Sequence, residues 1–285
     1  MSAAREIAPA AAGVLRSGVA KAEVQTLRAG QPAGRARVDR VAVEAPLEIR
    51  LGGQAATVLM RTPGDDEDLV RGFLFGEGMV GRAEDIAALR RPAGLQGDEV
   101  GNVIAVDLAP GCKRQPFERL FYSSTSCGVC GKNSIAQLAV RGAPSASRVT
   151  VGRRVLAQLP DRLRAAQAIF GETGGVHAAG LFTPTGELCA VREDVGRHNA
   201  TDKVIGWALA TGKTPLQQHV LLVSGRVSYE ILQKAIAAGI PVIAAVGAPS
   251  SLAIDLAEQF AVTLVGFLGA ASMNVYACPD RVGEP

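Results

Sequence analysis

Two cysteines separated by two residues are the clearest candidates for chemistry in this sequence. Cys127 and Cys130 lie in the stretch SCGVCGK, shortly before an apolar pattern beginning at Ile135 that predicts a helix. A helix N-terminus and a nearby lysine, here Lys132, both stabilise a thiolate and lower the pKa of a cysteine. A thiolate of this kind can attack sulfur, hold a persulfide, bind a metal or form a disulfide. The cysteine pair alone does not show which of these reactions the protein carries out.

The remaining metal-binding residue types are too scattered for a structural zinc site. Such a site needs about four ligands, and Cys112, Cys189 and Cys278 stand alone, without a second Cys-x-x-Cys pair. A zinc-dependent deaminase needs a histidine before its cysteine pair, whereas all three histidines follow Cys130. The sequence therefore predicts no metal site. Thiol–disulfide exchange remains open, although a thioredoxin-like pair would follow an early strand of a small domain.

Two polar clusters could also serve a ligand. His177 follows paired glycines in the stretch ETGGVH, and glycines let a backbone approach a ligand closely. The alternative for His177 is an ordinary turn. The stretch EDVGRHN contains Asp194 and His198, and His198 is spaced to share a helix surface with Asp202 and Lys203. A solvated helix start is the ordinary interpretation of that second cluster.

The last third of the chain predicts the scaffold that positions such residues. Apolar strands alternate with amphipathic helices, which indicates right-handed βαβ crossovers and a parallel sheet buried on both faces. The predicted strands are 220–223, 240–246 and 262–267, and the predicted helices are 227–238 and 251–259. Ligands of such sheets bind at the carboxyl ends of the strands. We therefore expect the loops 224–226 and 247–250 and the segment after Gly266 to converge at one edge.

The earlier part of the chain predicts a smaller unit of mixed type. Alternating apolar residues on both sides of a Gly-Gly pair predict a β-hairpin, and an acidic start followed by apolar spacing predicts a helix. The segments concerned are 41–51 and 57–60 for the hairpin, 65–76 for the helix, 104–108 for a further strand and 156–169 for a later helix. We expect an α+β lobe at 38–122 and an α/β core at 123–285.

Composition limits the classes of function. The 285 residues are 48% hydrophobic and carry a formal charge of +3. Residues 1–37 hold six basic and two acidic residues without periodicity, which predicts a flexible basic tail. Because the remainder is close to neutral, nucleic-acid binding is disfavoured. An odd count of five cysteines suits a reducing compartment. No apolar run is long enough for a membrane span, so we expect a cytoplasmic protein.

Taken together, these motifs resemble the FdhD family, the formate dehydrogenase accessory sulfurtransferases. The resemblance runs in the expected order from about Val38 to Val282. The stretches that carry it are SCGVCG at 126–131, TGGVHAA at 173–179, EDVGRHN at 193–199 with Asp202 and Lys203, SGRVSYE at 224–230 with Gln233 and Lys234, and TLVGF at 263–267 with Val275 and Tyr276. Five ordered motifs make the resemblance specific.

The resemblance implies a fold and an activity. The fold would be a three-layer α/β core of the cytidine-deaminase type, without the deaminase zinc and usually dimeric. The activity would be to accept sulfur from a cysteine desulfurase and pass it to the bis-molybdopterin guanine dinucleotide cofactor of molybdenum, or to its tungsten analogue. That sulfuration would then activate formate dehydrogenase.

The resemblance also assigns roles to residues. Cys127 would carry the persulfide, with Cys130 as its partner. The guanine dinucleotide would bind near the last strand, at Phe267, Leu268, Gly269, Ala270, Ala271 and Ser272. Family members often place Lys or Arg in that segment and this chain has neither, so we expect Arg226, together with Ser224, to meet the phosphates. His177, Asp194 and His198 would orient the cofactor or move protons. Guanosine diphosphate (GDP) should bind as a fragment of the cofactor.

Two other functions stay open at this point. A cofactor-binding chaperone would hold the bis-pterin and deliver it without moving sulfur. A thiol–disulfide oxidoreductase would reduce a generic disulfide without a sulfur donor. Retention of both Cys127 and Cys130 favours sulfur transfer.

Overall fold

The computed structural model describes residues 18–31, 34–112 and 142–284. Cys127, Cys130 and the helix predicted after them lie outside these residues. Among the described residues, no helix combines the length and the apolar character needed to cross a bilayer. The strands are β1 (Val19–Gln25), β2 (Ala36–Ala42), β3 (Ala45–Leu51), β4 (Gln54–Arg61), β5 (Ile86–Arg90), β6 (Val103–Leu108), β7 (Val151–Gly152), β8 (His177–Phe182), β9 (Leu188–Asp194), β10 (Val220–Val223), β11 (Val242–Ala245), β12 (Thr263–Gly266), β13 (Asn274–Ala277) and β14 (Val282–Gly283). The α-helices are α2 (Asp66–Gly76), α3 (Arg153–Ala166), α4 (Ala168–Thr173), α5 (Arg197–Ala210), α6 (Tyr229–Ala237) and α7 (Ser251–Gln259).

A six-stranded sheet forms the centre of the larger part of the molecule, in the order β13-β12-β11-β10-β8-β9. Strands β10, β11 and β12 are parallel, which confirms the βαβ prediction for this stretch. Strands β8, β9 and β13 run antiparallel to their neighbours, so the sheet is mixed rather than wholly parallel. The difference arises because β8–β9 and β12–β13 are joined by short connections, which return the chain in the opposite direction.

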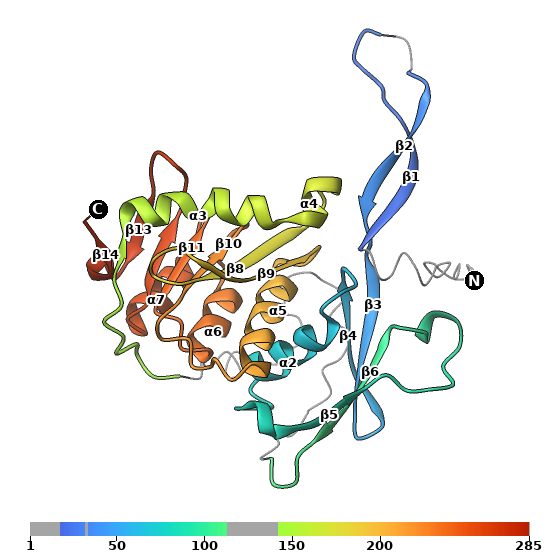
Figure 1. Cartoon of the computed structure of the whole chain (residues 1–285), viewed down its shortest axis with the longest axis horizontal. Helices are drawn as coiled ribbons and strands as arrows, with labels where there is room; N and C mark the ends of the chain where they lie inside the picture. Colours follow the sequence, from blue (N-terminus) through green and yellow to red (C-terminus); the bar gives the residue numbers. More distant parts are fainter. Residues whose placement is uncertain (1–17, 32–33, 113–141, 285) are drawn as a thin grey trace.

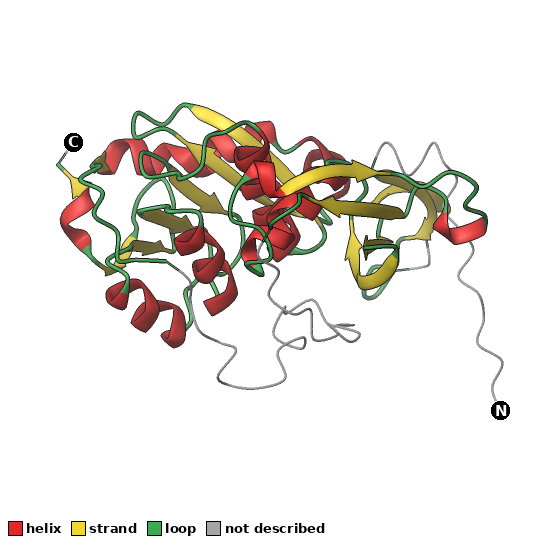
Figure 2. Cartoon of the chain, turned by 90° about the horizontal axis from the view of Figure 1, so that it is seen from below, coloured by secondary structure: helices red, strands yellow, loops and turns green. Residues whose placement is uncertain are grey.

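Helices cover both faces of this sheet (Figure 1 and Figure 2). Successive side chains of a strand point to opposite faces, and the two faces of β10 show this. Val220 and Leu222 pack with Leu156, Leu159 and Leu163 of α3. Leu221 and Val223 pack with residues of α5, α6 and α7 on the other side. The result is a mixed α/β unit whose strands are apolar on both faces.

The N-terminal lobe packs against that unit through α2. Its four-stranded sheet has the order β4-β3-β6-β5, and the hairpin β3–β4 and helix α2 confirm the sequence predictions. Leu69, Val70 and Leu74 of α2 lie with Leu47 and Ile49 of β3 in one buried cluster. The cluster also contains Leu209 of α5, so the lobe shares its core with the α/β unit.

Helices α2 and α5 approach each other unusually closely, and glycine on each helix makes this possible. A Cβ atom built on Gly72 would lie 1.9 Å from the carbonyl oxygen of Asp202, and one built on Gly206 would lie 1.8 Å from that of Asp68. Real Cβ atoms essentially never come nearer than 3.0 Å to such an atom. Any larger residue at either position would therefore push the helices apart.

Part of the predicted N-terminal tail is ordered, contrary to the sequence prediction for 1–37. Val19–Gln25 forms β1 and pairs with β2 in an antiparallel hairpin, which extends away from the body in Figure 1. Its attachment is local: the amide of Val43 donates to the carbonyl of Gly18 at 2.9 Å, and Arg40 pairs with Glu172 at 2.7 Å. Residues 20–25 do alternate between apolar and polar types, but two of the three apolar side chains are alanines and none is fully buried, so the pattern was too weak to predict a strand.

Candidate functional site

The loops that follow β10, β11 and β12 converge at one edge of the large sheet, as the sequence predicts. The amide of Gly247 donates to the carbonyl of Gly225 at 3.1 Å, and the amide of Phe267 donates to the carbonyl of Gly247 at 3.1 Å. A Cβ atom on Gly247 would lie 2.8 Å from the Gly225 oxygen, so only glycine fits there. We call these three loops, residues 224–226, 247–250 and 267–272, the rim.

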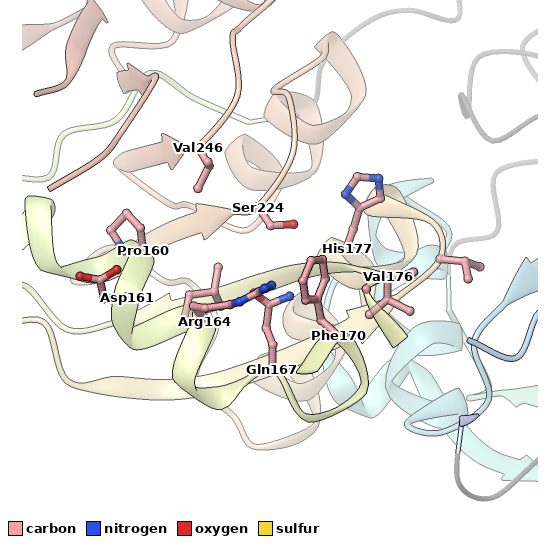
Figure 3. A pocket seen from close by; sticks show the side chains of 13 residues that line it. Pro160, Asp161, Arg164, Gln167, Phe170, Val176, His177, Ser224 and Val246 are labelled. Carbon is pink, nitrogen blue, oxygen red and sulfur yellow. The ribbon is translucent and has the colours of Figure 1, made fainter. Parts of the chain in front are cut away.

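A cavity of about 590 Å³ opens beside the rim (Figure 3). Its size is within the range of small-molecule sites. Helices α3 and α4 supply one wall, and the rim and the start of β8 supply the other. The lining residues are Pro160, Asp161, Leu163, Arg164, Gln167, Phe170, Gly174, Gly175, Val176, His177, Val195, Ser224 and Val246. Two of the predicted site residues, His177 and Ser224, are among them.

His177 is half-buried at one end of the cavity. Burial lowers the pKa of His177 below its ordinary value, and the nearby positive charge of Arg197 lowers it further. The imidazole is therefore neutral at physiological pH, with one ring nitrogen as donor and the other as acceptor. Ser224 is fixed beside it, because its Oγ accepts a hydrogen bond from the amide of Ala178 at 2.9 Å. Its hydroxyl proton remains available for a ligand.

His198 lies behind the cavity rather than in its wall. The ring is 8% exposed, and its Nε2 lies 3.2 Å from Ser228 Oγ and 3.7 Å from a carboxylate oxygen of Glu230. Burial by itself raises the pKa of Glu230, but hydrogen bonds with His198, with Ser228 and with the backbone outweigh it and bring the value to about 2. His198 therefore orders the starts of α5 and α6 and is not among the residues that line the cavity, and its role toward the cofactor stays a prediction.

The depressed pKa of Glu230 predicts a loss of stability in acid. The ordinary value is 4.5, so the folded state gains stability from this carboxylate above that pH and loses it as the pH falls towards about 2. The gain amounts to up to about 3 kcal/mol. We expect the free energy of unfolding of Glu230→Gln, measured by urea titration, to change less between pH 5 and pH 3 than that of the parent. Parallel curves would contradict the assignment.

Four polar residues of this cluster are buried, so the prediction of a solvated helix start is wrong: Asp194, His198, Asp202 and Lys203. Asp194 and Lys203 are 0% and 1% exposed and pair at 2.8 Å, and Asp194 also accepts the amide of Thr62 at 3.1 Å. Asp202 pairs with Lys234 at 2.7 Å, again in the interior. Charged side chains are buried only when they are paired and hydrogen-bonded. The sequence pattern does not show which charges find such partners, so it did not predict that these are buried. Asp194 joins the lobe to the core and does not face the cavity.

The rim residues predicted to bind nucleotide are divided between interior and surface. Phe267 is 53% exposed and has a positive φ of 50°, whereas the side chain of Leu268 is buried in the core. Gly269, Ala270, Ala271 and Ser272 form a tight turn, closed by a hydrogen bond from the amide of Gly269 to the carbonyl of Ser272 at 3.0 Å. Arg226 is exposed on the neighbouring loop and is not part of the cavity wall.

The three cysteines within the described residues are free, and two of them are poor nucleophiles. Burial raises the pKa of Cys189 and also that of Cys278, which disfavours the thiolate at neutral pH. In the part of the chain that the structure describes, no three His, Cys, Asp or Glu side chains lie close enough together to hold a metal ion.

Sequence reasoning missed the wall contributed by α3 and α4. Arg164, Gln167 and Phe170 line the cavity, yet none was a candidate. One signal was present: Gln167 continues the apolar face of Leu156 and Leu163 at helical spacing. A polar residue on an otherwise buried face is an informative position.

The structure is that of a mixed α/β protein with a cavity beside the carboxyl ends of its parallel strands, the usual place for ligands in such sheets. Residues 42–283 match the model of the FdhD/NarQ family. The chain belongs to this family, which confirms the resemblance seen in its motifs.

Two relatives and one solved structure show how far the similarity extends. A protein of Mycolicibacterium paratuberculosis named sulfur carrier protein FdhD is 52% identical over 266 residues, which cover 91% of this chain and 97% of the relative. One of the same name from Sulfurisphaera tokodaii is 43% identical and covers 86% and 92%. A crystal structure described as a formate dehydrogenase accessory protein from Desulfotalea psychrophila superposes with a TM-score of 0.74 at 25% identity, covering 93% of this chain and 99% of that one.

Proposed function

We propose that this protein is a sulfur carrier for the maturation of formate dehydrogenase. The observation that carries the proposal is the close similarity, over nearly the full length of both chains, to proteins named sulfur carrier protein FdhD. The sequence keeps the cysteine pair that such a function needs, at Cys127 and Cys130. The two described cysteines with raised pKa, Cys189 and Cys278, are unsuited to the same task.

The sulfur-accepting step is a thiolate exchange at sulfur. The Cys127 thiolate attacks the terminal sulfur of a persulfide on a cysteine desulfurase, and a new sulfur–sulfur bond forms as the donor bond breaks. The desulfurase cysteine leaves as a thiolate, so no external oxidant or reductant is consumed. Cys127 then holds the persulfide for transfer, and Cys130 is its partner in the same segment.

The acceptor in this proposal is the bis-molybdopterin guanine dinucleotide cofactor of molybdenum or tungsten, which is the substrate and not a resident group. The rim supplies its nucleotide site: Phe267 offers an exposed ring, the turn to Ser272 offers backbone amides, and Ser224 and Arg226 offer donors to phosphate. His177 at the cavity end is placed to orient the pterin part.

The remaining parts of the proposal concern fold type, assembly and place in the cell. The helices on both faces of a mixed sheet are consistent with a three-layer core of the cytidine-deaminase type. We infer a homodimer that works in the cytoplasm, takes its sulfur from a cysteine desulfurase and serves formate dehydrogenase. Sedimentation of the purified chain tests the dimer.

Intact mass measurement tests sulfur acceptance directly. After incubation with a cysteine desulfurase and cysteine, the chain should gain about 32 mass units, the mass of one sulfur atom. A thiol reductant should remove the gain. Absence of any gain under conditions that load another acceptor protein would refute the sulfur-carrier proposal and favour a cofactor-binding chaperone.

The nucleotide site at the rim predicts a preference for guanine nucleotide. Calorimetry should show binding of GDP and weaker binding of ADP. Because stacking on an aromatic ring contributes about 1–3 kcal/mol per base, Phe267→Ala should weaken GDP binding roughly tenfold. Leu188→Ala, which trims another exposed apolar side chain at the opposite edge of the sheet, is the matched control. Equal affinity for GDP and ADP would contradict a guanine-specific site at the rim.

A further inference from the structure

One wall of the cavity holds a buried hydrogen-bond donor that has no acceptor. Gln167 is 7% exposed, and its Nε2 makes no hydrogen bond with any residue that the structure describes. A buried donor without a partner is unfavourable, because it has lost its hydrogen bonds to water and gained none in return. Gln167 lines the cavity and is seen there in Figure 3. The cost is recovered if a ligand in the cavity supplies the missing acceptor.

A cation lies one helical turn before this donor. The guanidinium carbon of Arg164 stands 3.7 Å from the centre of the Phe170 ring, and this stacking holds the cation at the cavity wall. Arg164 forms no ion pair with any carboxylate among the described residues. The Phe170 ring covers one face of the guanidinium. The N–H groups point outward in the guanidinium plane and can still donate to a ligand.

The electrostatics differ between the two ends of the cavity. Asp161, the one carboxylate among its lining residues, lies beside Pro160 at one end, and His177 lies at the other (Figure 3). Arg197 lies close to His177 and lowers its pKa, and the buried Nε of Arg197 also lacks a partner among the described parts of the chain. The half of the cavity between Arg164 and His177 therefore favours negative charge.

We propose that Gln167 and Arg164 form an anion subsite that binds a phosphate or diphosphate group in this cavity. The donors available there are an amide N–H, a guanidinium and the hydroxyl of Ser224 on the facing wall. A diphosphate offers several oxygens to such a set and accepts charge-assisted bonds from arginine. This subsite rests on the proposed function, because the cofactor named there carries diphosphate groups, and it adds α3 and α4 to the residues of the rim.

Calorimetric titration with inorganic pyrophosphate tests the subsite. Arg164→Gln should weaken pyrophosphate binding at least about tenfold, the expected loss for one charge-assisted contact. Gln167→Leu should also weaken binding, and its free energy of unfolding should stay unchanged or rise because an unpaired buried donor has been removed. The matched control is Arg154→Gln, which removes the same charge from an exposed position of α3 outside the cavity. Guanosine, which lacks phosphate, should bind equally to the parent and to Arg164→Gln.

Three outcomes would overturn the subsite. They are unchanged pyrophosphate affinity in both cavity variants, an equal loss in Arg154→Gln, and a loss seen with Arg226→Gln but not with Arg164→Gln. The sulfur-carrier function is judged separately by the mass gain at Cys127, which needs no phosphate. If the protein binds pyrophosphate through Arg164 but takes up no sulfur, the subsite proposal stands and the sulfur-carrier proposal fails.

Discussion

Cys127→Ala is expected to abolish both the sulfur mass gain and the activation of formate dehydrogenase. The described thiols of Cys189 and Cys278 do not take its place as acceptor in the proposed step, since burial raises their pKa values and keeps them as thiols. The loss should be complete within the limits of detection. Intact mass before and after reductant measures the first effect, and reconstitution of formate dehydrogenase measures the second.

Cys189→Ala is the matched control for this experiment. It removes one thiol from the same chain and should retain both the mass gain and the activation. Cys130→Ala separates two roles of the second cysteine: a retained gain with lost activation indicates that Cys130 releases sulfur, and a lost gain indicates that it takes part in loading. Full activation of formate dehydrogenase by Cys127→Ala would rule out persulfide transfer through this residue.

Gly72→Ala is expected to destabilise the protein severely. The new methyl group would lie 1.9 Å from the carbonyl oxygen of Asp202, and both atoms belong to regular helices that cannot yield locally. We expect a loss of at least about 3 kcal/mol in the free energy of unfolding, at or above the usual range for overpacking. Urea denaturation followed by circular dichroism provides the measurement.

The control for this substitution is Gly171→Ala in α4. Gly171 is also helical but exposed, and no atom lies within 4 Å of an added Cβ. Replacing an unrestrained helical glycine by alanine stabilises by about 0.5–1 kcal/mol. The two Gly→Ala changes should therefore have opposite signs. A loss below about 1 kcal/mol at Gly72 would show that α2 and α5 separate easily.

The sequence predicted best those elements whose pattern is local. The unit from β10 to α7 was predicted from apolar strands that alternate with amphipathic helices. Each of these elements buries apolar residues that recur at its own period in the sequence. The predicted helix 251–259 has the bounds of α7, and Ser250 caps it by accepting the amide of Ala253. The convergence of the loops at the rim follows from parallel topology alone.

What the sequence did not predict depends on contacts between distant residues. Gly72 and Gly206 are 134 positions apart, and nothing in either helix pattern marks them as a backbone contact. Asp194 and Lys203 carry charges that suggest a surface, and their burial depends on pairing with each other and on hydrogen bonds with Thr62 and other residues distant in sequence or local to the β9–α5 turn. Gln167 falls inside the predicted helix 156–169, and nothing in that pattern shows that α3 and α4 line a cavity.

The contact between α2 and α5 also affects how the chain is made. Thr62 and Gly72 leave the ribosome early, but their partners at Asp194, Asp202 and Lys203 follow more than a hundred residues later. At synthesis rates of about 5–20 residues per second, that delay is about 7–28 s. During this delay, the face of α2 that contains Gly72 has no α5 to pack against. The amide of Thr62 likewise lacks the Asp194 carboxylate that accepts its hydrogen bond in the folded protein. The nascent lobe is thus most open to misassembly before α5 emerges, and protection of that face matters most during this interval of translation.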